Sequence, residues 1–139
     1  MSFVLDNSVA LSWCFEDEQT PSVMALLDRV VETGAMAPLL WPLEALNGLL
    51  VAERRRRLDA AKRAELAGLL RALPITLDDD TAEKSWEDTV RLAERFTLSV
   101  YDATYLELAQ RRRLPLASKD RALRSAAAAL GVEVLGEMP

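Results

Sequence analysis

Short apolar runs alternate along the chain with longer segments in which apolar residues recur at helical spacing. The apolar runs predict strands at about residues 3–6, 35–37, 75–77, 115–118 and 132–135. The segments between them predict helices at about residues 8–14, 21–33, 42–57, 60–73, 82–96, 100–113 and 121–130. Strands that alternate with helices in this way favour an α/β domain with a mostly parallel central sheet flanked by helices.

Residues that start and stop helices support these boundaries. Thr20 and Asp59 are suited to cap the helices that follow them, because their side-chain oxygens can accept hydrogen bonds from free backbone N–H groups. Ser99 can do the same for the segment that begins at residue 100. Gly34 and Gly131 follow helical segments and are typical stop residues.

Composition indicates one globular domain over residues 1–139. Half of the 139 residues are hydrophobic, which is enough for a packed core, and no apolar run approaches the length of a membrane span. The start of the chain lacks the basic region of a secretory signal. Cys14 is the only cysteine, which rules out an intrachain disulfide and favours a reducing, cytoplasmic setting.

The chemistry open to this chain is narrowed by the absence of histidine. Without histidine there is no Ser-His-Asp catalysis and no imidazole acid–base pair, and a single cysteine cannot build a Cys-rich zinc site. Carboxylates, hydroxyls, lysine, arginine and tyrosine remain as reactive groups.

Four acidic residues occupy positions from which they can form one site. Asp6 and Asp120 follow predicted strands, and Glu44 and Asp102 fall in the first turns of predicted helices. In parallel sheets, ligands bind beyond the carboxyl ends of the strands. If the fold gathers these carboxylates, they form a pocket for Mg²⁺ or Mn²⁺ suited to metal-assisted cleavage of a phosphodiester.

Each of these acids also has an ordinary structural explanation as a helix-start residue. Asp6 and Asp120 can be helix caps, Glu44 can favour the helix dipole, and Asp102 with Ser99 fits a capping box. Two neighbouring polar residues, Ser8 and Asn47, lie where they can support a metal site. Ser8 can equally be a helix-start hydroxyl, and Asn47 a solvated polar residue.

The net charge of −5 argues against a non-specific nucleic-acid binder but leaves room for local basic strips. Lys119 and Arg121 flank Asp120 and are candidates for RNA-phosphate contacts, or else they belong to a solvated helix start. The arginines at 54–57 are expected to complement the dipole at the end of a helix. The three tryptophans, Trp13, Trp41 and Trp86, are expected in the core, with a partner surface as the alternative.

Four segments, in order, resemble the motifs of PIN-domain ribonucleases, and in particular the VapC-type toxins of bacterial toxin–antitoxin pairs. They are FVLDNSV at residues 3–9, WPLEALNGLL at 41–50, SVYDATYLELA at 99–109 and LASKDRAL at 116–123. The ending ALGVEVL at residues 129–135 also fits. Two mild departures are Asn7, where a small hydroxyl residue is common, and Ser118, where threonine is usual.

This resemblance implies a PIN fold and a metal-dependent endoribonuclease. By resemblance, Asp6, Glu44, Asp102 and Asp120 would surround Mg²⁺ or Mn²⁺, with Ser118 in a supporting position. The resemblance further implies an RNA substrate, a homodimer and a cognate VapB-like antitoxin that silences the enzyme by occupying the cleft.

Three other classes remain open on the residues alone. A phosphatase of the haloacid-dehalogenase type also begins with a strand that ends in aspartate, but it usually has a second acid where this chain has Ser8. A receiver-like signalling domain would need paired acids near the first strand, whereas the adjacent acids here lie at residues 78–80. A non-catalytic scaffold that only binds a partner is the third.

Overall fold

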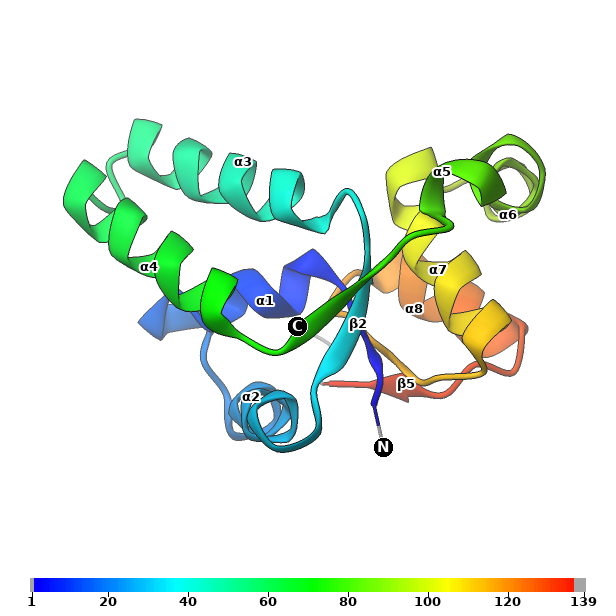
Figure 1. Cartoon of the computed structure of the whole chain (residues 1–139), viewed down its shortest axis with the longest axis horizontal. Coiled ribbons are helices and arrows are strands. Elements are labelled where there is room, and N and C mark those ends of the chain that lie inside the picture. Colours follow the sequence, from blue (N-terminus) through cyan, green and yellow to red (C-terminus); the bar gives the residue numbers. More distant parts are fainter. Residues whose placement is uncertain (1, 137–139) are drawn as a thin grey trace.

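A computed structural model describes residues 2–136 as one parallel sheet covered by helices (Figure 1). The strands are β1 (Val4–Leu5), β2 (Ala35–Pro38), β3 (Ile75–Asp78), β4 (Leu116–Ala117) and β5 (Val134–Leu135). They lie in the order β3-β2-β1-β4-β5, and every neighbouring pair is parallel. The predicted α/β class and the predicted strand positions are therefore confirmed.

The helices begin and end close to the positions that the sequence signals indicate. They are α1 (Asn7–Ser12), η1 (Glu16–Glu18), α2 (Pro21–Thr33), α3 (Trp41–Arg54), α4 (Ala60–Ala72), α5 (Thr81–Lys84), η2 (Ser85–Thr89), α6 (Val90–Phe96), α7 (Val100–Arg112) and α8 (Arg121–Ala129). The side chains of Thr20, Asp59 and Ser99 accept the capping hydrogen bonds expected of them.

One predicted helix differs from the expectation. The segment 82–96 is not a single regular helix, because residues Ser85–Thr89 form a π-helical turn between α5 and α6. At the start of this turn the hydroxyl of Ser85 donates a hydrogen bond of 2.7 Å to the carbonyl of Thr81. Such side-chain bonds compete with the regular helical ladder, and π turns interrupt helices in just this way.

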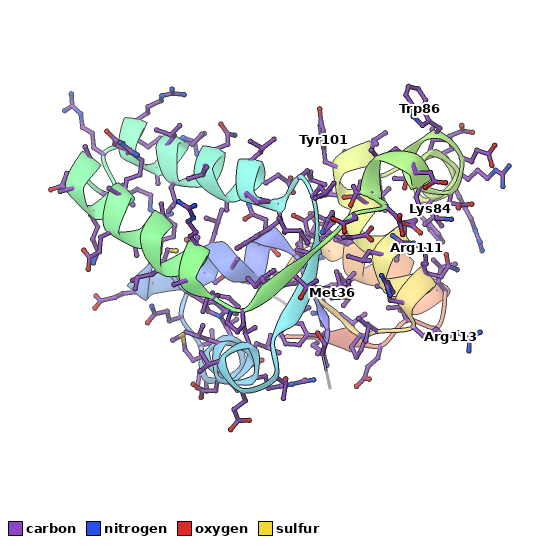
Figure 2. The ribbon with its side chains drawn as sticks, viewed as in Figure 1. Met36, Lys84, Trp86, Tyr101, Arg111 and Arg113 are labelled. Atoms are coloured by element: carbon purple, nitrogen blue, oxygen red, sulfur yellow. The ribbon has the colours of Figure 1, made fainter. Side chains whose placement is uncertain are left out.

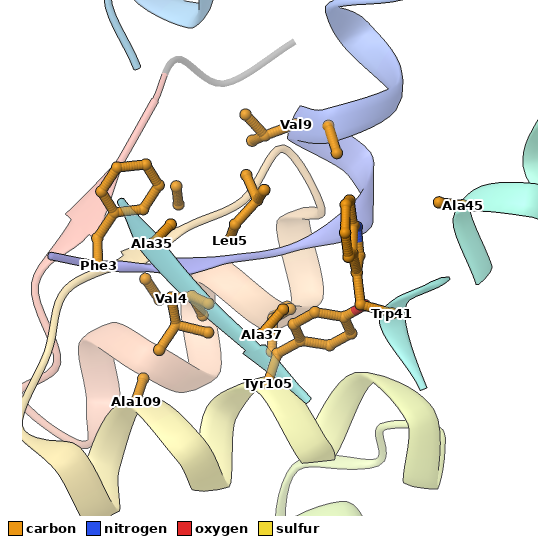
Figure 3. Close-up of a cluster of buried hydrophobic side chains, with 14 of the residues drawn as sticks. Phe3, Val4, Leu5, Val9, Ala35, Ala37, Trp41, Ala45, Tyr105 and Ala109 are labelled. Atoms are coloured by element: carbon orange, nitrogen blue, oxygen red, sulfur yellow. The ribbon is translucent and has the colours of Figure 1, made fainter. Parts of the chain in front are cut away.

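The core lies on both faces of the sheet, and α7 contributes much of it. Helix α7 packs across β2, β1 and β4, and seven consecutive residues from Ala103 to Ala109 are buried. Figure 3 shows Val4 and Ala109 packed between the sheet and α7. The expected core position is confirmed for Trp13 and Trp41, which are 8% and 5% exposed, and is wrong for Trp86, which is 85% exposed because no part of residues 2–136 covers it.

The strand order reverses between β1 and β4. From β1 the chain proceeds to β2 and β3 on one side of the sheet, and later returns to add β4 and β5 on the other side. Ligands bind at such reversal points of parallel sheets, outside the carboxyl ends of the strands. Among the helices formed within residues 2–136, none combines the length and the apolarity that a membrane-spanning segment requires.

Candidate active site

Asp6 lies at the strand-order reversal, directly after β1. Its backbone N–H donates to the carbonyl of Ala117 at the end of β4, at 3.0 Å, which joins the two strands where they end. Its side chain is 4% exposed, and its Oδ2 accepts hydrogen bonds from Ser8 at 2.6 Å and from Ser118 at 2.9 Å. Asp6 occupies the N-cap position of α1, but its side chain makes no capping hydrogen bond to that helix.

The Asp6 carboxylate is held in an environment that disfavours its charge. Burial raises the pKa of Asp6 from 3.8 to about 6, the hydrogen bonds from Ser8 and Ser118 oppose this rise, and the negative charges of Asp102 and Glu44 add to it. A nearby cation would relieve both the desolvation and the repulsion. Perturbation of this kind is typical of functional sites.

Glu44 reaches the same region from the first turn of α3. Its Oε1 accepts a hydrogen bond of 2.6 Å from the hydroxyl of Tyr105, a fully buried residue of α7. Burial raises the pKa of Glu44, the Tyr105 hydrogen bond opposes the rise, and the charge of Asp102 adds to it.

Asp102 and Asp120 stand at the N-terminal ends of α7 and α8. The backbone N–H of Asp102 donates to the Ser99 hydroxyl at 3.0 Å, so Ser99 provides the cap of α7. The pKa of Asp102 is raised by burial and by the negative charge of Asp120. Asp120 does cap its helix, because its Oδ1 accepts from the N–H of Leu123 at 2.8 Å.

The four carboxylates are linked by mutual repulsion rather than by a closed set of contacts. The negative charges of Asp102 and Glu44 help to raise the pKa of Asp6. The charge of Asp102 does the same for Glu44, and the charge of Asp120 does the same for Asp102. Within residues 2–136, no lysine or arginine forms an ion pair with any of the four. In that same part of the chain, no three acidic or cysteine side chains stand close enough together to hold a metal ion.

The chemistry of these donors nevertheless fits a hard divalent cation. All of them are carboxylate oxygens, which Mg²⁺ and Mn²⁺ prefer, and Mg²⁺ keeps several waters, so it does not require a complete protein cage. Burial and neighbouring negative charges disfavour the ionised form of Asp6, so a bound cation would stabilise that form. We conclude that the donor set fits such an ion.

Two of the supporting residues contact Asp6 directly. Ser8 and Ser118 hold Asp6, and they also receive the backbone N–H groups of Lys119 and Asp120, at 2.9 and 3.0 Å. Two small hydroxyls thereby fix the loop after β4 onto the end of β1.

Three other predicted residues form no side-chain hydrogen bond or ion pair with the four carboxylates within residues 2–136. Asn47 is exposed on α3, and Arg121 is exposed at the start of α8. The ammonium group of Lys119 donates to the hydroxyl of Ser12 at 2.9 Å, so this side chain is directed toward α1.

Tyr105 was not predicted as a site residue. In the sequence it is one of several apolar positions along its helix, and only its place one turn after Asp102 connects it with the candidate acids. Its partner, Glu44, lies 61 residues away in the chain, and only the packing of α7 near α3 brings the two together.

An all-parallel sheet in this order, with carboxylates at the carboxyl ends of its central strands, defines an α/β protein with a candidate site at the strand-order reversal. The model of the PIN domain family matches residues 3–129. The chain therefore belongs to the PIN domain family.

Several solved structures share this fold. PAE2754 from Pyrobaculum aerophilum matches with a TM-score of 0.68 and 22% identity over 91% of this chain and 84% of its own. A toxin–antitoxin complex from Klebsiella pneumoniae matches with 0.62 and 18% over 97% of each chain. VapC20 of Mycobacterium tuberculosis, described as a sarcin–ricin loop cleaving toxin, matches with 0.63 and 19% over 90% of this chain and 95% of its own. Comparison with curated protein sequences found no match.

Proposed function

We propose that this protein is a metal-dependent endoribonuclease that acts in the cytoplasm as the toxin of a type II toxin–antitoxin pair. The observation that carries the proposal is the buried Asp6 carboxylate, raised in pKa and repelled by Glu44 and Asp102 with no ion-pair partner among residues 2–136. Membership of the PIN family supports nuclease activity as the general class. The printed descriptions of two structural neighbours, a toxin–antitoxin complex and an RNA-loop cleaving toxin, support the finer assignment.

The residues that would hold Mg²⁺ or Mn²⁺ are Asp6, Glu44, Asp102 and Asp120. PIN nucleases generally use divalent metals, which supports this assignment. When bound, the cation would offset the negative charge that develops on the phosphoryl oxygens and make water a better nucleophile.

The chain's own groups would perform the remaining steps. Ser8 and Ser118 hold the Asp6 carboxylate in one orientation, and Tyr105 does the same for Glu44. The water oxygen would attack phosphorus, the bond from phosphorus to the leaving ribose oxygen would break, and the water proton would pass to a carboxylate oxygen. The leaving ribose oxygen would take up a proton from solvent water. In the absence of histidine, that carboxylate would be Glu44 or Asp120.

Two basic residues beside Asp120 would contribute to RNA binding. Arg121 is exposed and free to approach a phosphate from the start of α8. Lys119 is bound to Ser12, so it would have to leave that hydroxyl to reach RNA. The charge reversals Arg121→Glu and Lys119→Glu should both weaken RNA binding. The effect of Arg121→Glu should be the larger of the two.

A second copy of the chain and a VapB-like antitoxin are the proposed protein partners. Support for a homodimer comes from large apolar side chains left exposed on α3, η2 and α7: Leu43 at 72%, Trp86 at 85% and Tyr101 at 66%. Figure 2 shows Trp86 and Tyr101 projecting from the same edge of the molecule. Exposed apolar surface of this kind marks interaction sites.

A further apolar surface suits the antitoxin. A groove of about 720 Å³ runs between α3 and α4, and its lining includes Leu49, Leu70 and Leu77 together with Arg71 and with Arg63, which is paired with Glu53. The apolar face of an amphipathic helix with acidic residues would complement it. This groove would supplement contacts that the antitoxin makes in the cleft.

The test is cleavage of total bacterial RNA by partner-free protein. Reactions with Mg²⁺ or Mn²⁺, with EDTA, and with an Asp6→Asn variant are compared by mapping new 5′ ends. Discrete cuts that need the metal and disappear in Asp6→Asn are the expected result. Asp59→Asn is the matched control, because Asp59 caps α4 away from the cleft and its variant should cut like the parent.

A non-catalytic partner-binding scaffold is the remaining alternative. It predicts no metal-dependent cuts from folded, antitoxin-free protein and no loss of metal binding in Asp102→Asn. The phosphatase and receiver classes are set aside because the chain belongs to the PIN family.

A further inference from the structure

The hydroxyl of Tyr105 is placed to control the position of Glu44. Tyr105 is 0% exposed, and its only partner among the side-chain hydrogen bonds of residues 2–136 is Oε1 of Glu44, at 2.6 Å. Figure 3 shows its ring rising from α7 toward Trp41 at the start of α3. A buried phenol that donates to a carboxylate makes a short, charge-assisted hydrogen bond.

This hydrogen bond joins two helices that each carry a candidate metal ligand. Asp102 lies one turn before Tyr105 on α7, and Glu44 lies on α3. The Tyr105 bond occupies Oε1 of Glu44 and leaves Oε2 without a protein donor among the described residues. Helix α7 thus fixes the rotamer of a carboxylate on α3 relative to its own Asp102.

We propose that Tyr105 is a positioning residue that orients the Glu44 carboxylate for a divalent cation. The inference rests on the proposed function, since it assumes that Glu44 is a metal ligand. Hydrogen-bond donors that orient ligating carboxylates commonly contribute 10–100-fold to metal affinity.

The chain offers a matched control because it contains only two tyrosines. Tyr101 is on the same helix, next to Asp102, but it is 66% exposed. We expect Tyr105→Phe to weaken Mn²⁺ binding by about 10-fold or more, and Tyr101→Phe to leave it unchanged, as measured by isothermal titration calorimetry. The RNA-cleavage rate of Tyr105→Phe should recover toward that of the parent at saturating Mn²⁺.

A merely structural role gives a different result. It predicts a lower melting temperature for Tyr105→Phe with the parent's Mn²⁺ affinity, and this outcome overturns the inference. In a Glu44→Gln background the inference predicts that Tyr105→Phe has no further effect on Mn²⁺ affinity, whereas an unchanged decrease overturns it. If the parent itself does not bind Mn²⁺, both the proposed function and this inference fail. If the parent binds and Tyr105→Phe binds equally well, only the inference fails.

A measurement on the unmodified protein covers the case in which Tyr105→Phe does not fold. With ¹³C-labelled tyrosine the NMR spectrum contains signals from Tyr101 and Tyr105 alone. Titration with Mg²⁺ should shift the signal of the buried Tyr105 ring more than that of the exposed Tyr101 ring. A Tyr105 signal that does not respond to Mg²⁺ overturns the inference.

Discussion

At Asp6, two hydroxyl donors and a buried setting act in opposite directions. Ser8 and Ser118 favour the ionised carboxylate, while desolvation and two neighbouring carboxylates favour the protonated form, and the second group of effects is larger. The ionised Asp6 side chain therefore lowers the free energy of unfolding. Electrostatic destabilisation of this kind is expected where a side chain serves binding or catalysis.

A stability measurement can detect this conflict. The pKa of Asp6 is about 6 in the folded protein against 3.8 for the free side chain, so the folded state binds the proton more tightly. The destabilising contribution is absent below about pH 4, grows as the pH rises through this interval, and is complete above about pH 6. Asp6→Asn should therefore raise the free energy of unfolding by up to about 3 kcal/mol near neutral pH and by little near pH 4, in urea titrations with EDTA.

The control for this prediction is Asp59→Asn, which replaces an exposed aspartate of α4 by another good N-cap residue and should change stability little at either pH. An Asp6→Asn variant that is less stable than the parent at neutral pH would show that the carboxylate is not destabilising. Saturating Mg²⁺ should narrow the difference, because only the parent retains the charge that a cation stabilises.

At the scale of the elements, α7 is anchored at its C-terminal end by a buried charge cluster. Arg111 donates to Glu107 on its own helix and to Asp78 at the end of β3. Burial alone would raise the pKa of Asp78, but the hydrogen bonds and the charge of Arg111 help to hold it below its usual value. The helix that carries Asp102 and Tyr105 is thereby fixed to the sheet.

Removing the Arg111 side chain should destabilise the folded protein. Arg111→Ala leaves Asp78 and Glu107, which are 2% and 5% exposed, without their cation, and we expect a loss of about 3–5 kcal/mol in the free energy of unfolding. Arg112→Ala, which removes an exposed neighbour, is the control and should cost little. Because the folded pKa of Asp78 is lowered, its contribution is present above its unfolded pKa and disappears as the pH falls through the folded value. A cost for Arg111→Ala that is the same at acidic and neutral pH would contradict this account.

Two helical glycines allow a matched test of helix packing. A Cβ added at Gly68 on α4 would meet no atom within 4 Å, whereas one added at Gly48 on α3 would lie 2.5 Å from the Leu11 side chain. Gly68→Ala should stabilise the protein by about 0.5–1 kcal/mol, because alanine is the better helix former. Gly48→Ala should stabilise the protein by less, because the Leu11 side chain has to move. Urea titrations of the two variants should rank them in this order, and a larger gain for Gly48→Ala would be inconsistent with the packing of α1 on α3.

At the scale of the whole molecule, one edge carries exposed aromatic side chains that the fold does not use. If a second copy covers this edge, Trp86→Glu should shift the mass measured by light scattering from dimer to monomer while the melting temperature of the monomer stays unchanged. Val31→Glu introduces the same charge at a 64% exposed residue of α2 and should remain dimeric. A parent protein that is monomeric at high concentration would contradict the proposed homodimer.

Local signals in the sequence identified most of the elements. The caps at Thr20, Asp59 and Ser99 and the stops at Gly34 and Gly131 act within one helical turn, so they can be recognised without the fold. The π turn at Ser85–Thr89 is not marked by a distinct sequence signal, although the hydrogen bond from Ser85 to Thr81 at its start is local. The exposure of Trp86 was not predictable, because it depends on what packs against the segment. For the candidate site, the four acids were chosen from sequence, and their role as metal ligands stays a prediction.

The sequence by itself determined the alternation of strands and helices, the chemistry open to a chain without histidine, and the PIN motifs. These properties depend on residue type and short-range spacing. Only the tertiary structure decided that Asp6 is buried between two hydroxyls, that Asp120 caps its helix while Asp6 does not, and that Tyr105 binds Glu44. The contact between Ser118 and Asp6 joins residues 112 positions apart, and it exists because the parallel strands β1 and β4 bring their carboxyl ends to one edge of the sheet. The contact between Tyr105 and Glu44 exists because α7 packs near α3.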